Sequence, residues 1–253
     1  MSAPINHFKS ALQTGKLQRG IWLTLGSAVV AEIAGQSGFD WCLIDGEHAP
    51  YDPTAIRTQL IALDATGTAA IVRVPTNADW LLKQVLDLGA QTVLVPMVDT
   101  AADAAAAVAA CRYPPFGRRG MGPAIARSGR FGATQGYPET ANAQICVIVQ
   151  AESRAALENL DDICAVDGVD AVFIGPADLA SDMGYIHDMG NPVVLNAIDA
   201  AIATIRAHGK PAGIITFDPA EQARYAAGGI TILGLGADAH VLAGSLRALG
   251  SPE

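Results

Sequence analysis

The sequence contains few cysteines, few aromatic residues and few charges, and it has no long apolar run. Four cysteines occur among its 253 residues, Cys42, Cys111, Cys146 and Cys164, and no two of them form a C-x-x-C pair. This spacing predicts neither a zinc knuckle nor a disulfide framework, because both need paired or clustered cysteines. Most of the four lie in apolar stretches, so we expect them to be buried free thiols.

Basic residues are also scarce, since 16 Lys and Arg stand against 25 Asp and Glu and give a formal net charge of -9. An acidic chain without a Lys/Arg run offers no electrostatic footprint for a nucleic acid or a membrane surface. The apolar stretches are strand-length, and residues 1–10 lack the layout of a signal peptide. We therefore expect a soluble cytoplasmic protein that binds neither nucleic acid nor membrane.

Short β-rich runs alternate with Ala-rich amphipathic segments along the chain. The eight runs that read as strands are GIWLTLG (20–26), DWCLIDG (40–46), AAIVRVP (69–75), TVLVPMV (92–98), ICVIVQAE (145–152), DAVFIGP (170–176), PAGIIT (211–216) and TILGLG (231–236). The clearest helical stretches are 27–38, 78–89, 100–112 and 192–209. Strands that are apolar on both faces and alternate with helices predict a parallel sheet covered by helices.

Eight such units in about 250 residues match a closed (β/α)₈ barrel, an α/β fold also called the TIM barrel. No linker interrupts the pattern, so we expect one domain over residues 1–253. The alternative is a doubly wound open sheet, for which GLGADA at 234–239 supplies a nucleotide-binding fingerprint. That match is weak because it follows the last strand, and its glycines fit a tight turn better.

Residues 112–140 depart from this alternation because they form a long stretch rich in Gly, Pro and Arg. Loops of this length in a compact domain usually have a function or contact a partner. In a barrel this connection leads from a helix to the next strand, on the face opposite the usual active site. We expect a contact between subunits there, and the alternative is a solvated loop with free arginines.

Polar residues gather where four of the predicted strands end, which is where barrel enzymes carry their chemistry. They are Asp45, Glu47 and His48 after the second strand, Arg73 in the third, Gln150 and Glu152 at the end of the fifth, and Gly175, Pro176, Ala177 and Asp178 at the end of the sixth. Their shared position predicts one site at the mouth of the barrel. Singly, Arg73 could instead form a structural ion pair with Asp45 or Glu47.

Glu152 and Asp178 end adjacent predicted strands, so their carboxylates can converge on one point. Two carboxylates without a cysteine or a second histidine nearby favour a hard divalent ion over zinc. The alternative is that both residues cap helices. Beside them Gly175 lets a ligand approach the backbone, and the N–H groups of Ala177 and Asp178 favour a small carboxylate.

Four longer runs carry a family resemblance: GFDWCLIDGEHAP (38–50), QTVLVPMV (91–98), RYPPFGRRGMG (112–122) and GVDAVFIGPADLASDMGY (168–185). They resemble the metal-dependent class II pyruvate aldolases of the 4-hydroxy-2-oxoheptanedioate aldolase and 2-dehydro-3-deoxyglucarate aldolase family. The resemblance covers nearly the whole chain and implies a (β/α)₈ barrel that assembles as a homohexamer. It also implies a lyase of aromatic catabolism that cleaves 4-hydroxy-2-oxo acids to pyruvate and an aldehyde.

The same resemblance implies roles for individual residues. Glu152 and Asp178 would bind Mg²⁺, Mn²⁺ or Co²⁺, His48 would act in acid/base catalysis with Asp87 as its dyad partner, and Arg73 would sit at the carbonyl end of the substrate. From their position at the strand ends, we expect Asp45 and Glu47 to support the site and Gln150, Gly175, Pro176, Ala177 and Asp178 to contact the substrate. Asp87 ends the helix that returns to the fourth strand, away from His48, so we expect the dyad to join two chains. The alternative for Asp87 is an exposed carboxylate at a helix end.

No lysine ends a predicted strand, so neither Lys83 nor Lys210 is expected to form a Schiff base. Two other functions fit the same barrel. One is an acyl-CoA lyase of the citramalyl or malyl type, which would bind CoA tightly. The other is a non-catalytic barrel that binds a 2-oxo acid, which would not exchange the protons of pyruvate in deuterated water.

Overall fold

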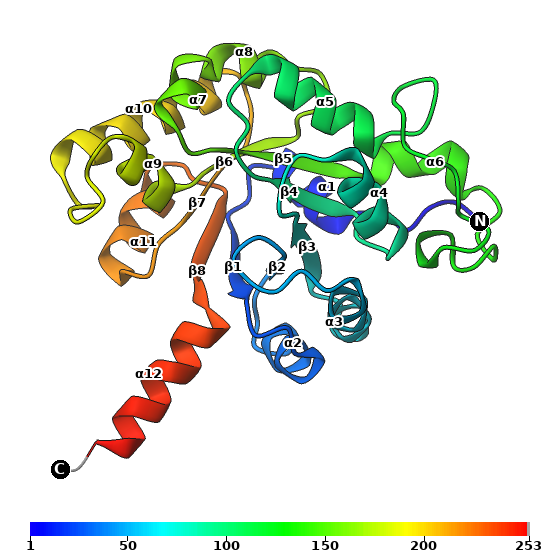
Figure 1. Cartoon of the computed structure of the whole chain (residues 1–253), viewed down its shortest axis with the longest axis horizontal. Helices are drawn as coiled ribbons and strands as arrows, with labels where there is room; N and C mark the ends of the chain where they lie inside the picture. The colour runs from blue at the N-terminus through cyan, green and yellow to red at the C-terminus, as the bar shows by residue number, and fades with distance from the viewer. Residues whose placement is uncertain (252–253) are drawn as a thin grey trace.

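Eight parallel strands form a closed barrel in the computed structural model, which describes residues 1–251 (Figure 1). Each strand pairs with the next, and β8 pairs with β1 to close the barrel. The strands are β1 (Gln18–Leu23), β2 (Trp41–Asp45), β3 (Ala69–Arg73), β4 (Thr92–Val95), β5 (Cys146–Ala151), β6 (Ala171–Ile174), β7 (Ala212–Ile215) and β8 (Ile232–Ala237). The predicted (β/α)₈ barrel is confirmed, and the closure between β1 and β8 excludes the open doubly wound sheet.

Helices surround the barrel, and one of them, α12, extends away from it (Figure 1). They are α1 (His7–Gln13), α2 (Ala28–Gly35), α3 (Pro53–Thr66), α4 (Asp79–Asp87), α5 (Ala101–Cys111), η1 (Arg127–Gly129, a 3₁₀ helix), α6 (Tyr137–Gln144), α7 (Arg154–Glu158), α8 (Leu160–Ala165), α9 (Pro176–Asp182), α10 (Pro192–Ala207), α11 (Pro219–Ala227) and α12 (Asp238–Gly250). The four predicted helical stretches correspond to α2, α4, α5 and α10. Within residues 1–251, no helix is both long and apolar enough to cross a membrane.

Side-chain caps set where the chain turns from a strand into the following helix. Thr100 and Asp103 form a capping box at the start of α5, in which each side chain accepts a hydrogen bond from the other residue's N–H. Ser153 caps α7 by accepting a hydrogen bond from the Ala156 N–H at 2.9 Å. These caps satisfy N–H groups that have no partner within the helix, and they fix the loops at the carboxyl ends of the strands, here called the upper face.

The N-terminal helix closes the opposite, lower face of the barrel. Phe8 and Leu12 of α1 are buried, and they belong to the same apolar cluster as Trp22, Trp41 and Phe173 inside the barrel. The Trp22 ring lies 5.4 Å from each of the other two rings, in edge-on or tilted contact. The interior is therefore a filled core, and substrate can reach the strands only at the upper face.

Glycines in the strands make room for these rings. A Cβ atom at Gly20 would lie 2.0 Å from the Trp41 ring, and one at Gly234 would lie 2.7 Å from the Trp22 ring. Gly234 lies within β8, so the expectation that it serves a tight turn is wrong. The reason is packing, because each ring lies over the neighbouring strand at a position where that strand has no side chain.

The four cysteines are buried and unbridged, which confirms the prediction of free thiols. Burial raises the pKa of Cys42 to about 12, with a further contribution from the charge of Asp238. Burial also raises the pKa of Cys111 to about 12. Thiols with such pKa values stay protonated and unreactive at neutral pH, so these cysteines serve the core.

Residues 112–140 cross the lower face, and four of their arginines are held in ion pairs. Arg112 pairs with Asp167, Arg118 with Asp79, Arg119 with Asp87 and Arg127 with Asp64. These arginines are therefore not free, although Arg118 stays solvated, with 49% of its side chain exposed. Large apolar side chains of the same segment are exposed instead, namely Phe116, Met121, Ile125 and Phe131.

The contact between Gly20 and Trp41 gives a test of the barrel interior. We expect Gly20→Ala to lower the free energy of unfolding by about 3 kcal/mol or more, because the Trp41 ring is fully buried and has no space to move. Gly190→Ala is the control, since no atom lies within 4 Å of a Cβ at that position. Urea unfolding at one fixed protein concentration measures both, and equal stability of the two variants would contradict this packing.

Candidate active site

Two carboxylates hold the Arg73 guanidinium at the upper ends of β2 and β3. Asp45 accepts hydrogen bonds from Arg73 Nε at 2.9 Å and from Nη2 at 2.7 Å. Glu47 Oε2 lies 2.7 Å from Arg73 Nη1, in ion-pair contact. Burial works against the charged guanidinium, but the bond to Asp45 outweighs it and the pKa of Arg73 is raised. The ion pair foreseen as an alternative is formed with both carboxylates, and it leaves at least two of the five guanidinium N–H groups free.

The turn after β2 is tied to β3 through its backbone. Gly46 donates its N–H to the Arg73 carbonyl at 2.9 Å, and a Cβ atom at Gly46 would lie only 2.7 Å from that oxygen. Asp45 Oδ1 also accepts the Glu47 N–H at 3.0 Å. The turn therefore needs glycine for its close approach, and its path leaves His48 exposed at the mouth of the barrel.

Glu152 lies buried just beyond β5, and its two carboxylate oxygens have different neighbours. Oε1 accepts the Met97 N–H at 2.8 Å, and Oε2 accepts from the Gln150 amide. Met97 has a φ of 51°, a left-handed conformation that residues with a side chain rarely adopt. A Cβ at Gly175 would lie 2.3 Å from Glu152 Oε2, so the position of the carboxylate depends on glycine there. Gln150, predicted to lie beside the substrate, thus holds Glu152.

The surroundings of Glu152 favour its neutral form when no cation is bound. Burial raises the pKa of Glu152 to about 7, the Met97 N–H lowers it, and the charges of Glu47 and Asp178 raise it further. Glu152 forms no ion pair with any residue in the range 1–251. Asp178 lies within electrostatic reach of Glu152, and the two residues follow the adjacent strands β5 and β6.

The capping alternative for these two carboxylates is wrong. Ser153, the residue after Glu152, caps α7. The N-cap residue of α9 is Gly175, and no side chain makes a cap hydrogen bond there. Asp178 lies in the first turn of α9 and is exposed, so its carboxylate is free to bind a ligand.

These donors fit a hard divalent ion. The carboxylates of Glu152 and Asp178 offer only oxygen, and the buried Gln150 Oε1 has no hydrogen-bond partner. In the described part of the chain, no group of three or more His, Cys, Asp or Glu side chains is placed to hold a metal. An ion held by two carboxylates would complete its coordination with water and substrate oxygens, as Mg²⁺ does in enzymes.

His48 and Asp87 do not meet within one chain. No hydrogen bond or ion pair joins the His48 ring to any group of residues 1–251. Asp87, the last residue of α4, instead accepts a hydrogen bond from Arg119 Nη2 at 2.7 Å. The Arg119 side chain is fully buried, and its guanidinium lies 4.5 Å from the centre of the Tyr113 ring. Asp87 is therefore a partly buried carboxylate that Arg119 holds, with 27% of its side chain exposed.

Sequence reasoning missed several residues that shape this site. Met97, Asp99 and Asp238 act through backbone geometry or contacts between loops. Asp99 accepts a hydrogen bond from the Ser153 hydroxyl at 2.5 Å. Asp238 accepts hydrogen bonds from the Thr24 N–H and hydroxyl at 2.8 and 2.7 Å, which ties the start of α12 to the loop after β1. The position of Asp99 after a strand was a usable signal, but nothing in the sequence marks the left-handed backbone of Met97.

Comparisons with known proteins agree with this geometry. Residues 18–244 match the family model described as HpcH/HpaI aldolase/citrate lyase. The chain is 51% identical to a hydroxypyruvate/pyruvate aldolase of Agrobacterium fabrum, over 99% of this chain and 94% of that protein. It is 48% identical to a 4-hydroxy-2-oxovalerate aldolase of Rhodococcus jostii, over 99% and 97%. A crystal structure of a family member from Burkholderia cenocepacia matches with a TM-score of 0.93 and 38% identity, over 96% of this chain and 98% of that one.

The chain therefore belongs to the HpcH/HpaI aldolase/citrate lyase family. Membership confirms the class inferred from the sequence, a carbon–carbon lyase of the class II pyruvate aldolase type. The expected retro-aldol reaction, which gives pyruvate and an aldehyde, is confirmed with it, and the non-catalytic alternative is wrong. Class II aldolases generally depend on a divalent metal ion, which agrees with the oxygen donors at the strand ends.

The raised pKa of Glu152 predicts how metal binding depends on pH. Because the metal-free site holds a proton below a pH of about 7, the affinity for a divalent ion should rise with pH up to that value and then level off. Calorimetry with Mn²⁺ in buffers of different ionisation enthalpy should detect about one proton released per ion well below pH 7 and almost none above pH 8.

Glu152→Gln is the control for this titration, since it cannot release a proton from that position. The variant should bind Mn²⁺ weakly and without the pH-dependent proton release. If the affinity of the wild type for Mn²⁺ stays constant from about pH 5.5 to about pH 8, deprotonation of Glu152 does not control metal binding.

Proposed function

We propose that this enzyme cleaves 4-hydroxy-2-oxo acids, such as 4-hydroxy-2-oxoheptanedioate, with Mg²⁺, Mn²⁺ or Co²⁺ held by Glu152 and Asp178. The observation that carries this proposal is the buried Glu152 carboxylate, which lies close to Asp178 and has no cation of its own. The aldolase names of relatives at about half identity support the substrate class. The unbridged thiols support a reducing compartment, so we place the reaction in the cytoplasm.

His48 is the proposed base of the cleavage step. It takes the proton from the C4 hydroxyl of the substrate, the C3–C4 bond breaks, and C4 leaves as the aldehyde carbonyl. The bonding electron pair stays on the other fragment as an enolate, which becomes pyruvate when C3 takes up a proton. A bound divalent ion supplies the Lewis acidity that stabilises this enolate. In the reverse direction His48 returns the proton to the new hydroxyl.

Arg73 is the proposed donor to the oxygen that becomes negative. Its bidentate bond to Asp45 fixes the plane of the guanidinium, and its remaining N–H groups are available to the substrate. The two negative charges of Asp45 and Glu47 exceed the single positive charge of Arg73. Arg73 therefore orients the substrate more than it neutralises negative charge on it. The carboxylate of the substrate fits beside Gly175, Pro176 and Ala177, where the backbone at the start of α9 is accessible.

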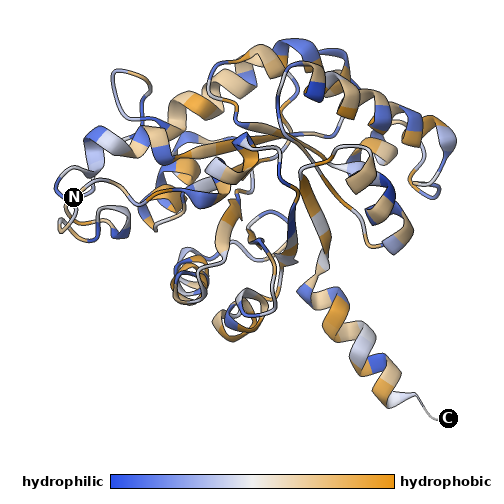
Figure 2. Cartoon of the chain, turned by 180° about the vertical axis from the view of Figure 1, so that it is seen from behind, coloured by the Kyte–Doolittle hydropathy of each residue, from blue (hydrophilic) through white to orange (hydrophobic). Residues whose placement is uncertain are grey.

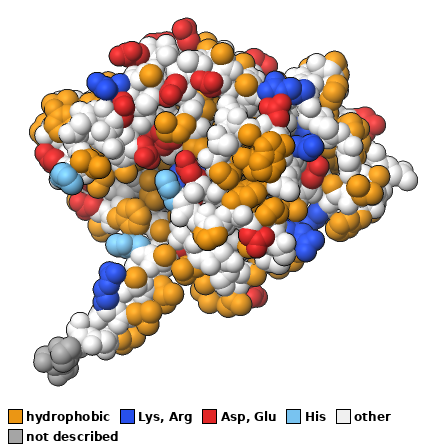
Figure 3. Space-filling model, in the orientation of Figure 1, with side chains coloured by type: hydrophobic (Ala, Val, Ile, Leu, Met, Phe, Trp, Pro, Cys, Tyr) orange, Lys and Arg blue, Asp and Glu red, His pale blue; other side chains and the backbone are white. Residues whose placement is uncertain are grey.

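We further propose that the enzyme assembles as a homo-oligomer, and the family resemblance indicates a homohexamer. Helix α12 leaves the barrel with apolar residues along its length (Figure 2). Four of them are exposed, and helix α2 also presents apolar residues to solvent. These side chains are Val241, Leu242, Leu246 and Leu249 on α12 and Val29 and Ile33 on α2. Figure 3 shows hydrophobic atoms along the projecting helix, a surface that a monomer in water would not expose.

Assembly would also complete the catalytic dyad. Asp87 lines a hollow of about 490 Å³ on the lower side of α4, together with the exposed side chains of Trp80, Ile125 and Phe131. Arg119 fixes one carboxylate oxygen of Asp87, which leaves the other for a partner. A neighbouring subunit whose mouth docks there would bring its His48 to Asp87, and Asp87 would then orient that imidazole.

Replacing the proposed metal ligands tests the function. Glu152→Ala and Asp178→Ala should each lower kcat/KM for 4-hydroxy-2-oxoheptanedioate by about a thousandfold, because the loss of the ion removes several kcal/mol of transition-state stabilisation. Pyruvate release, coupled to lactate dehydrogenase, measures the rate after chelation and metal re-addition. Asp182→Ala is the control, since Asp182 is an acidic residue of the same helix α9 that pairs with Arg154. Full activity in Glu152→Ala or Asp178→Ala would show that these residues do not form the metal site.

Mixed oligomers test the origin of the dyad. His48→Ala and Asp87→Ala chains are each expected to be inactive, and the two are denatured together in equal amounts and refolded. If the dyad joins two chains, about a quarter of the sites should pair an intact His48 with an intact Asp87, and about a quarter of the wild-type activity should return. No recovery in oligomers shown by mass spectrometry to be mixed would place the dyad within one chain or remove Asp87 from it.

A further inference from the structure

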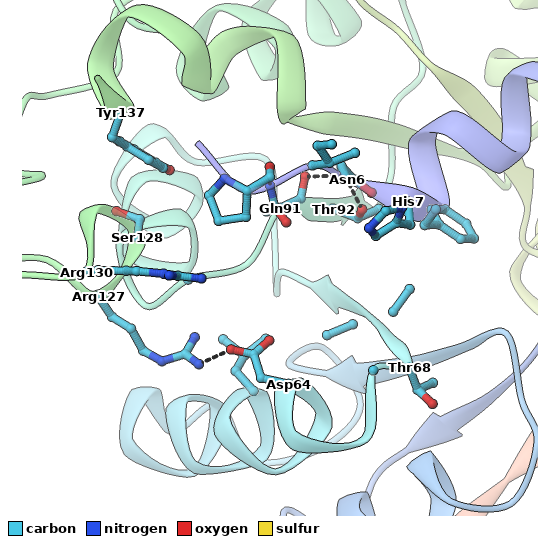
Figure 4. A pocket seen from close by; sticks show the side chains of 18 of the residues that line it. Asn6, His7, Asp64, Thr68, Gln91, Thr92, Arg127, Ser128, Arg130 and Tyr137 are labelled. Atoms are coloured by element: carbon cyan, nitrogen blue, oxygen red, sulfur yellow. Dashed lines mark hydrogen bonds and ion pairs between the residues drawn. The ribbon is translucent and has the colours of Figure 1, made fainter. Parts of the chain in front are cut away.

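A cavity of about 580 Å³ opens on the lower face of the barrel, on the side opposite the active site. Its walls come from the N-terminal segment, the end of α3, the starts of β3 and β4, and the loop around η1 (Figure 4). Phe8, Leu60 and Phe131 supply apolar wall. A volume of this size, with mixed walls, is typical of sites for small molecules.

Arg130 reaches into this cavity without a partner of its own. Figure 4 shows its guanidinium pointing into the space, with the His7 ring on the other side and Tyr137 pointing inward. Within residues 1–251 the Arg130 guanidinium forms no hydrogen bond and no ion pair, in contrast to Arg118, Arg119 and Arg127 of the same segment. An unpaired cation in a concave wall attracts an anion, and here it does so in a chain with a net charge of -9.

The backbone that presents Arg130 is unusual. Arg130 and Phe131 have φ values of 50° and 55°, so two consecutive residues with side chains adopt the left-handed conformation. This conformation costs free energy at each such residue, and it persists where the surrounding structure compensates for it, often at binding sites. The Phe131 N–H donates to the Ala126 carbonyl at 3.0 Å, which closes the loop and directs both side chains. Ser128 nearby is buried, and its hydroxyl has no partner.

The charge of the neighbouring Arg127 is already balanced by an ion pair, and this limits the negative charge that a ligand of the cavity can carry. Arg127 pairs with Asp64 and donates to the Leu88 carbonyl at 3.2 Å. A Cβ at Gly89 would lie 2.2 Å from Arg127 Nη1, so the chain makes room for this guanidinium by having glycine there. One unpaired arginine beside an aspartate suits a single negative charge, and the Asp64 carboxylate disfavours a polyphosphate. The apolar walls suit a hydrocarbon body.

We propose that this cavity is a second ligand site, which binds a small organic carboxylate with an apolar body through Arg130. The carboxylate forms a charge-assisted pair with the guanidinium, which is planar and matches two carboxylate oxygens. The Tyr137 hydroxyl and the His7 ring add polar contacts, and Phe8, Leu60 and Phe131 enclose the hydrocarbon part. The cavity opens on the face opposite this chain's own strand-end site, and it adjoins the hollow around Asp87, with which it shares Arg127 and Phe131.

The cavity has a structural connection to the catalytic machinery. Arg127 and Phe131 line both this cavity and the hollow that contains Asp87. The carbonyl that Arg127 binds belongs to Leu88, the residue directly after Asp87. A ligand that orders the loop at 127–131 therefore also fixes the end of α4. The proposed ligand is thus placed to influence the position of Asp87 from outside the active site.

Calorimetric titration with benzoate tests this site, because benzoate has one carboxylate and an apolar ring. The enzyme is first saturated with Mg²⁺ and pyruvate, so that the catalytic site is filled. Benzoate should then bind with a saturable isotherm, and benzyl alcohol and inorganic phosphate should bind at least about tenfold more weakly. Arg130→Gln should weaken benzoate binding by about tenfold, which corresponds to about 1.4 kcal/mol. Arg130→Lys should recover most of that loss.

Arg19→Gln is the matched control, since Arg19 is an exposed arginine at the start of β1, on the same face and outside the cavity. Its affinity for benzoate should stay within about twofold of the wild type. Unchanged binding in Arg130→Gln, no saturable binding to the wild type, or competition between benzoate and pyruvate would each overturn the proposal. Equal affinity for phosphate would also overturn it, because the cavity would then be a general anion site.

Discussion

The burial of Glu152 is the constraint on which the upper face of this enzyme depends. A carboxylate that is 2% exposed loses most of its hydration, and its pKa rises to about 7 unless a cation compensates for the loss. The surrounding residues keep it in place through the Met97 N–H, the Gln150 amide and the open space at Gly175. None of these neighbours carries a positive charge. The proposed divalent ion would supply the positive charge that these neighbours do not provide.

A second network on the same face stabilises a buried cation instead of a buried carboxylate. Arg73 is a buried cation with two carboxylates around it, and it would be left with Glu47 as its only ion-pair partner in residues 1–251 if Asp45 were removed. The Asp45 pair joins β2 to β3, so it orders the turn that carries His48. The upper face thus holds the Arg73 cation, which has two carboxylates around it, and the carboxylates of Glu152 and Asp178, which form no ion pair within residues 1–251. Both arrangements favour a reaction in which a divalent ion supplies the missing positive charge.

The lower face has a different character, because several of its charged groups are held in ion pairs and apolar side chains are exposed beside them. Arg119 fixes Asp87, and Arg127 fixes the end of α4 through the Leu88 carbonyl. The segment 112–140 exposes apolar side chains there, and the projecting helix α12, which begins at the upper end of β8, exposes others. Proteins bury such surfaces in contacts between subunits. The proposed contact between subunits would bring together a histidine that has no partner within residues 1–251 and a carboxylate that Arg119 holds in position.

The sequence by itself determined the barrel, the buried thiols and the carboxylates at the strand ends. The alternation of apolar runs with helices allows few topologies, and in a closed parallel barrel every strand end points to the same face. This is why Glu152 and Asp178 could be placed together although 26 positions separate them. Tertiary structure alone decided the left-handed backbone of Met97 and Arg130 and the pairing of Asp87 with Arg119. These features depend on distances between segments far apart in the chain, and no residue type or local spacing encodes such distances.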